Sequence, residues 1–140
     1  MSEVNQDDNF VFSPLSLHTA LSMVYLGAKD GSKTQDQLAR SLGGITSPRF
    51  INKAYQNIME FVGNESETIL FGNNIWVKEG YGLKQDFTNN LANNFKAGVD
   101  NLDFGLFNAT DFVNDWVSEN TNGKITEVLF LNWELENDMI

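Results

Sequence analysis

The sequence has 140 residues, of which 41% are hydrophobic, and this is enough for one domain with a moderate core. Its formal net charge is −10. Because nucleic acids, anionic membrane surfaces and sulfated polysaccharides are bound through Lys and Arg, this charge argues against all three as partners. The sequence has no cysteine, which excludes disulfides, thiol nucleophiles and thiolate metal sites.

The first predicted helix follows a polar start. Residues 1–8 are acidic and lack the pattern of a signal peptide, so we expect a disordered or trimmed end. A short apolar strand at residues 10–12 leads to Ser13, which suits the N-cap of a helix, and to Pro14, which suits its first position. The helix is apolar almost all round as far as Gly27. We therefore predict that it is buried, with other elements on every side.

Two more helices are predicted before the first long strand. A short one begins with Ser32 or Thr34 as N-cap and ends at residues 43–44, which are both glycine. The next begins at residues 47–48, Ser-Pro, and ends at Gly63. Its apolar residues recur at helical spacing and give it one apolar face: Ile51, Ala54, Tyr55, Ile58, Met59 and Val62.

The second half of the chain alternates between strands and helices. Residues 68–78 are apolar on both faces at a period of two, which predicts an interior strand, with Asn74 in a hydrogen-bond network between layers. A helix with apolar residues 87, 91 and 95 and a second strand over residues 98–104 follow. A last helix begins near Asn108 or Thr110 and ends at residues 122–123, before one more apolar turn at residues 125–129. Because two strands make a marginal sheet, we predict an α+β chain that is part of a larger fold.

The residue pattern predicts no catalytic, cofactor or metal site. The one histidine, His18, lies in the first helix, and no nucleophile motif accompanies it. Two tryptophans, Trp76 and Trp116, have the spacing of core residues. Two sequons, at Asn64 and Asn108, are potential N-glycosylation sites of a secreted protein. Taken alone, these observations indicate a protein that is not an enzyme.

Six segments of the sequence carry recognisable motifs: Asn9–Ser16, Leu21–Ala28, Thr34–Leu38, Asn74–Val77, Asp103–Phe104 and Val113–Ile125. In this order they resemble motifs of the serpin family of serine protease inhibitors. The last segment, VNDWVSENTNGKI, is the most specific, because its fixed residue types rarely recur in order by chance.

This resemblance implies an incomplete serpin fold. Residues 9–140 would be the N-terminal part of a serpin domain, with helices and two strands of the large central sheet. The family's first helix and the C-terminal two-thirds of its domain would be missing. The reactive-centre loop of the family lies near its C-terminus, so no residue of this sequence is expected to belong to it.

The resemblance also implies a mechanism and a set of gate residues. In the family, a target protease attacks the exposed loop, and the cleaved loop then inserts into the large sheet and distorts the acylated protease. A polar cluster, the shutter, controls the opening of the sheet. The positions that match this shutter or would form part of its gate are Ser13, Pro14, Ser16, Asn114, Trp116 and Thr121. Ser13 and Ser16 can also be interpreted simply as helix-start residues.

Partner and location are also implied by the family. The partner of the full-length parent would be a serine protease, bound through the missing loop. Arg49 and Lys53 alone do not support the heparin site that some members carry in this helix. Most members of the family are secreted, which implies an extracellular location. Some branches lack signal peptides and are cytosolic, so a cytoplasmic location is the alternative. The alternatives are a non-inhibitory serpin that acts as carrier, chaperone or storage protein, and a gene-model fragment without function.

Overall fold

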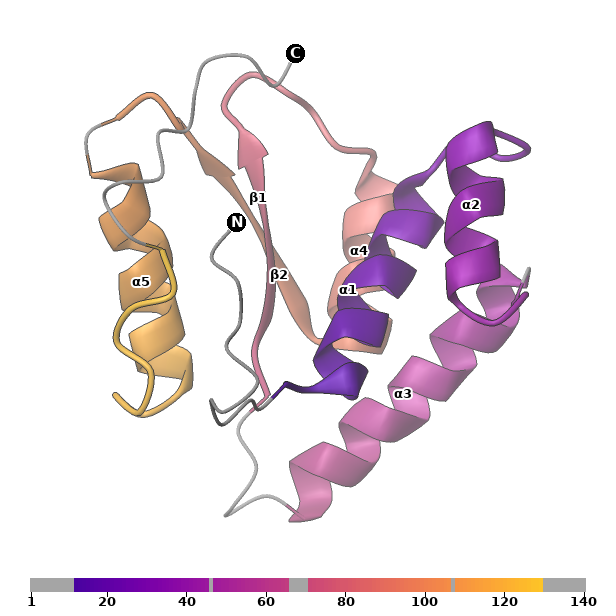
Figure 1. The fold of residues 1–140 in the computed structure, drawn as a ribbon, viewed down its shortest axis with the longest axis horizontal. Helices are drawn as coiled ribbons and strands as arrows, with labels where there is room; N and C mark the ends of the chain where they lie inside the picture. The colour runs from indigo at the N-terminus through magenta and orange to yellow at the C-terminus, as the bar shows by residue number, and fades with distance from the viewer. Residues whose placement is uncertain (1–11, 46, 66–70, 107, 130–140) are drawn as a thin grey trace, which may run out of the picture. The chain divides into compact units, whose positions relative to one another are not determined.

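The computed structural model describes residues 12–45, 47–65, 71–106 and 108–129. The chain forms two compact units, Met1–Thr46 and Ser47–Ile140, which we call the first and the second unit (Figure 1). No helix in the described part of the chain is both long enough and apolar enough to cross a membrane.

The first unit contains helices α1 (Pro14–Gly27) and α2 (Lys33–Ser41). Helix α1 begins as predicted, and α2 begins after Ser32, which is one of its two predicted N-caps. The Ser13 side chain accepts a hydrogen bond from the backbone N–H of Ser16 at 3.2 Å, and the Ser32 side chain accepts from that of Gln35 at 3.2 Å. Each serine satisfies a backbone donor that the helix leaves free.

Helix α1 is less covered than its apolar sequence predicts. Leu17 and Val24 are more than half exposed, whereas the polar residues Thr19 and Ser22 are fully buried. The Thr19 hydroxyl donates to the Leu15 carbonyl at 2.7 Å, which satisfies it within the helix. The prediction of cover on every side is therefore wrong for the described structure. A helix that is apolar all round needs neighbours on all its faces, and the described residues do not supply that many.

The second unit holds the sheet and three helices: α3 (Pro48–Glu65), β1 (Asn73–Lys78), α4 (Gln85–Phe95), β2 (Ala97–Leu102) and α5 (Ala109–Asn120). Helix α3 passes Gly63 and ends two residues later than predicted. The first strand begins at Asn73, so residues 71–72 of the predicted strand are not part of it, and residues 68–70 of that prediction lie outside the described residues. Residues 124–129 are not helical, so the predicted last apolar turn is not formed as a helix.

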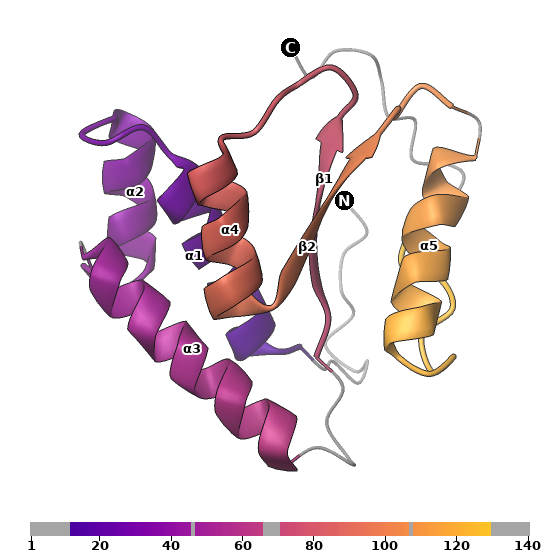
Figure 2. The ribbon, with the colours of Figure 1, turned by 180° about the vertical axis from the view of Figure 1, so that it is seen from behind.

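Strands β1 and β2 pair in parallel, in a register that joins Asn73 to Ala97 and Lys78 to Leu102. Parallel neighbours require a crossover, and α4 provides it. Figures 1 and 2 show α4 and α5 flanking the two strands, one on each side.

The core of the second unit has two parts, one on each side of the strands. On the α4 side, the rings of Tyr55 and Phe95 stack with centroids 4.5 Å apart, which joins α3 to α4. On the α5 side, the buried residues Leu102, Ala109 and Val113 form a cluster against which three partly buried residues pack, namely Trp76, Phe104 and Leu129. Side chains of α5 therefore pack against one face of the sheet.

Candidate functional site

The start of α1 brings three of the predicted gate residues together. The Ser16 hydroxyl donates to the Ser13 hydroxyl oxygen at 2.9 Å, in addition to the backbone bond that caps the helix. Pro14 lies between them at the first helical position. Both serines are exposed. The two hydroxyls thus form a small polar pair on the surface of the first unit, and the cap interpretation of Ser13 is confirmed.

Asn114 ties α5 to the segment that follows it. Its side-chain oxygen accepts from the backbone N–H groups of Val128, at 2.9 Å, and Leu129, at 3.0 Å. Its side-chain nitrogen donates to the Leu129 carbonyl at 2.9 Å. One amide side chain therefore uses both of its ends to hold residues 128–129 against the helix, across 14 to 15 residues of sequence.

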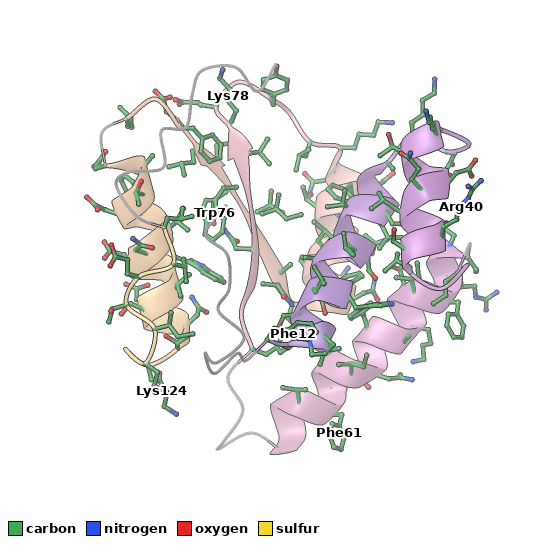
Figure 3. The ribbon with its side chains drawn as sticks, viewed as in Figure 1. Phe12, Arg40, Phe61, Trp76, Lys78 and Lys124 are labelled. Atoms are coloured by element: carbon green, nitrogen blue, oxygen red, sulfur yellow. The ribbon has the colours of Figure 1, made fainter. Side chains whose placement is uncertain are left out.

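Trp116 anchors α5 to the sheet. Its ring meets the ring of Trp76 edge to face, with centroids 5.3 Å apart and planes at 90°. This is a favourable geometry for an aromatic pair. Figure 3 shows Trp76 extending from β1 toward α5. Gly72, just before β1, permits this approach, because a Cβ atom there would lie only 3.0 Å from the Trp116 ring.

Thr121 closes the C-terminal end of α5. Its hydroxyl oxygen accepts from the backbone N–H of Ile125 at 3.0 Å, and the hydroxyl lies 3.2 Å from the Ile125 carbonyl. This side chain therefore bonds across the loop of residues 121–125, in addition to the backbone bond from the Lys124 N–H to the Thr121 carbonyl at 3.1 Å. Three residues of this region thus have three different contacts. Asn114 holds residues 128–129 to α5, Trp116 contacts the sheet, and Thr121 bonds to the loop that follows the helix.

The six predicted gate residues fall into two groups. Ser13, Pro14 and Ser16 belong to the first unit, and Asn114, Trp116 and Thr121 to the second. The structure describes each unit by itself, so a single gate formed by both groups stays a prediction.

A polar pair across the two strands was only partly predicted. The Asn74 side-chain nitrogen donates to the Asp100 carboxylate at 3.0 Å, which confirms a hydrogen-bond partner for Asn74 but places it on the neighbouring strand. The Asn74 side-chain oxygen is buried and has no hydrogen-bond partner. It lies directly over Gly98, whose register partner is Asn74 itself. The sequence contains both Asn74 and Gly98, but only the register of the two strands shows that they lie opposite each other. The contact could therefore not be predicted from the sequence.

The Gly98→Ala substitution tests this contact. The added methyl group would overlap the Asn74 oxygen, so the Asn74 side chain must turn away and its bond to Asp100 is lost. We expect the free energy of unfolding to fall by about 0.5–1.5 kcal/mol, which is the contribution of one hydrogen bond, measured by urea unfolding. The control is Gly63→Ala in α3, where an added Cβ meets no atom within 4 Å. It should leave stability unchanged or raise it by up to about 1 kcal/mol. Equal effects of the two substitutions would contradict the contact.

The histidine lies beside a serine of its own helix. His18 Nδ1 lies 3.4 Å from the Ser22 hydroxyl, one turn along α1. The Ser22 side chain is fully buried. Residues 12–45, 47–65, 71–106 and 108–129 contain no group of three or more His, Cys, Asp or Glu side chains that could hold a metal ion.

The two sequons differ in what the structure describes. Asn108 is exposed and precedes α5, and its side chain makes no capping hydrogen bond to that helix. The Asn64 side chain lies outside the described residues.

A family model described as "Serpin (serine protease inhibitor)" matches residues 1–138. Among curated proteins, Serpin-Z4 of Hordeum vulgare is 37% identical over 130 residues, which are 86% of this chain and 32% of that protein. A leukocyte elastase inhibitor of Xenopus laevis is 30% identical over 134 residues, covering 92% of this chain and 35% of that protein. The chain therefore spans about a third of the length of the curated relatives it matches.

Solved structures agree with the fold. A serine protease inhibitor, serpin-12, of Manduca sexta matches with a TM-score of 0.81 and 26% identity, over 91% of this chain and 35% of that one. AtSerpin1 of Arabidopsis, in a form titled "Native Stressed Conformation", matches with a TM-score of 0.77 and 27% identity, over 91% and 34%. The helices and two strands described above are similar to one portion of these larger folds.

Proposed function

The chain belongs to the serpin family and has the incomplete fold of that family, and from this premise we propose that the protein of which it is part inhibits serine proteases by loop insertion. The observation that best supports this proposal is the sheet face under α5. A parallel pair of strands is covered there by one helix through specific, separable contacts. Such a cover suits a sheet that must rearrange as a unit, and relatives named as protease inhibitors share this portion of the fold.

In the proposed mechanism the protein acts as a substrate that traps its enzyme. The target protease cleaves an exposed loop and is held as an acyl-enzyme while the loop enters the large sheet as a new strand. The inserted strand must find a gap in the sheet, so the strands and their covering helix must separate from their neighbours. In this mechanism the residues of this chain supply two strands of the sheet and the helix that covers them, and they supply no catalytic group. We propose that the protein is not an enzyme.

The gate proposal assigns each contact a role in that movement. Trp116 would hold α5 on β1 through Trp76, and Asn114 would hold residues 128–129 to the outer part of the helix. The hydroxyl pair of Ser13 and Ser16 would be the polar element of the gate that α1 supplies. Exposed hydroxyls that bond to each other can exchange partners at little cost, since a new partner replaces an old one.

The test of the proposed function compares two lengths of chain. The longer protein that contains these residues should form a complex with a serine protease that survives SDS, whereas the 140-residue chain should form none, because the reactive loop is proposed to lie outside it. The measurement is a gel-shift assay with trypsin-like, chymotrypsin-like and elastase-like enzymes.

Each outcome of that assay is informative. A stable complex with the 140-residue chain would contradict the placement of the loop. Failure of the longer protein with all three enzyme classes would favour the non-inhibitory alternative, a carrier, chaperone or storage protein, and bulky or charged residues in the hinge of its loop would support that alternative. If no transcript encodes a longer protein, the remaining alternative is a gene-model fragment without function.

Partners and location are proposed on the same premise. The partner is a serine protease, and the net charge of −10 argues against nucleic acids, membrane surfaces and heparin. On α3, Lys53 donates to the Gln56 side chain at 3.1 Å, so this lysine is engaged within its own helix. We propose an extracellular location, in which the exposed Asn108 would be glycosylated, with a cytoplasmic location as the alternative.

A further inference from the structure

The C-terminal cap of α5 contains two consecutive residues in the left-handed region of backbone space. Asn122 has φ 52° and Gly123 has φ 71°, and both are exposed. The Gly123 N–H donates to the Ser118 carbonyl at 2.8 Å, five residues back. This bond is the hallmark of the Schellman motif, which ends many helices.

Asn122 is the one asparagine of the sequence that is followed by glycine. An asparagine amide can be attacked by the backbone nitrogen of the next residue, and a glycine there offers no side chain to obstruct the approach. The nitrogen of Gly123 would bond to Cγ of Asn122 and lose its proton to solvent, while the side-chain nitrogen leaves as ammonia. The resulting cyclic imide is opened by one water molecule. Opening at Cγ yields aspartate, and opening at the main-chain carbonyl yields isoaspartate.

We propose that Asn122 is a site of spontaneous deamidation and that the cap of α5 controls its rate. The attacking nitrogen is the one whose N–H is donated to Ser118 in the folded cap. A nitrogen engaged in this way keeps its proton and stays fixed to the helix. The cap must therefore open before the reaction can begin, and local opening of this kind is an equilibrium property of the fold.

Thr121 is the residue that sets how often the cap opens. Its hydroxyl oxygen accepts from the Ile125 N–H at 3.0 Å, which closes the loop that contains Asn122 and Gly123. The backbone N–H of Thr121 also donates to the Val117 carbonyl at 3.0 Å. Without the hydroxyl, the loop of residues 121–125 loses this side-chain bond and keeps the backbone bond from the Lys124 N–H to the Thr121 carbonyl, so the cap should open more often.

The reaction would change the end of α5 permanently. Either product places a carboxylate at the C-terminus of a helix, where the helix dipole disfavours negative charge. Isoaspartate also adds a methylene to the main chain, which alters the spacing that the bond from Gly123 to Ser118 requires. The end of α5 would then be held less firmly. This inference rests on the chemistry of the cap and does not depend on the proposed function.

The experiment ages the 140-residue chain at neutral pH, in buffer and in urea, and follows Asn122 by peptide mapping and an isoaspartate assay. Asn120, which is followed by the branched residue Thr121, is the internal control and should react far more slowly in urea. Deamidation of Asn122 should be slower in buffer than in urea. The ratio of the two rates should equal the protection factor of the Gly123 amide, measured by hydrogen exchange in buffer. Equal rates in buffer and urea, or no reaction at Asn122 in urea, would overturn the proposal.

Substitutions at Thr121 supply an independent arm. Thr121→Ala should raise the rate in buffer roughly three- to tenfold, which is the effect of one lost hydrogen bond on an opening equilibrium, and leave the rate in urea unchanged. Thr121→Ser keeps the hydroxyl and should behave like the parent. An unchanged rate for Thr121→Ala in buffer would contradict control by the cap. The exchange comparison uses the unsubstituted chain, so it decides the matter even if a variant does not fold.

Discussion

The Phe95→Ala substitution is expected to lower the free energy of unfolding of the second unit by about 3–5 kcal/mol. Phe95 is fully buried, and its ring stacks on Tyr55 with centroids 4.5 Å apart and planes at 27°. Removing the ring leaves a cavity between α3 and α4 and takes away the aromatic contact that joins them. A total stability of roughly 5–15 kcal/mol is typical of a domain, so much of it would be lost.

The measurement for Phe95→Ala is urea unfolding followed by tryptophan fluorescence, since Trp76 and Trp116 both lie in the same unit as Phe95. The matched control is Phe61→Ala. Phe61 is a phenylalanine of α3 that is 64% exposed and points away from the fold in Figure 3. Its removal should change stability by no more than about 0.5 kcal/mol. Similar losses for both variants would show that the stack of Phe95 on Tyr55 is not a core contact.

The parts of the fold that sequence predicts well are those decided by neighbours in the chain. Ser13 caps its helix as predicted, and Ser32 is one of the two predicted caps of α2, because a cap depends on residues within one turn. The apolar residues of α3 at helical spacing include Ile51, Tyr55 and Met59, and all three are buried. The periodicity of a helix carries this information without knowledge of what the helix packs against.

The parts that sequence does not predict depend on distant pairing. The hydrogen bond between Asn74 and Asp100 joins residues 26 apart and requires the parallel register of β1 and β2. The exposure of Leu17 and Val24 on α1 is equally non-local, because apolar residues indicate that cover is needed and not whether it is present. The two groups of predicted gate residues can each be described within their own unit. Whether the two groups form one gate depends on how the larger fold is assembled.

The Asn114→Ala substitution should release residues 128–129 from α5 and reduce stability by about 2–4 kcal/mol. It removes three hydrogen bonds, each worth about 1 kcal/mol net, and leaves the Val128 and Leu129 amides without that partner. Hydrogen exchange measured by mass spectrometry gives the direct test, because the amides of Val128 and Leu129 should exchange faster in the variant. Slow exchange of these two amides in Asn114→Ala would contradict the role of the side chain.

Two further variants separate the contributions of the amide. Asn114→Asp keeps an oxygen that can accept from Val128 and Leu129 but places a carboxylate beside the Leu129 carbonyl. The free energy of unfolding of this variant should therefore lie between that of the parent and that of Asn114→Ala. Asn120→Ala removes an asparagine whose side chain bonds only to the Trp116 carbonyl, one turn back, at 2.8 Å. Its effect should be small, about 0.5 kcal/mol or less, because an exposed local bond competes directly with water.

The order of these effects bears on the proposed gate. A helix that merely covers a sheet needs apolar contacts, which Trp116 and Val113 already provide. Asn114 adds a polar connection to the segment beyond the helix, and such bonds are directional, so they are either made or broken. If alanine frees residues 128–129 while α5 stays on β1 through the pair of Trp116 and Trp76, the segment can move without the helix. The opening proposed for the sheet would then begin at this amide, and the tryptophan pair would be the second contact to yield.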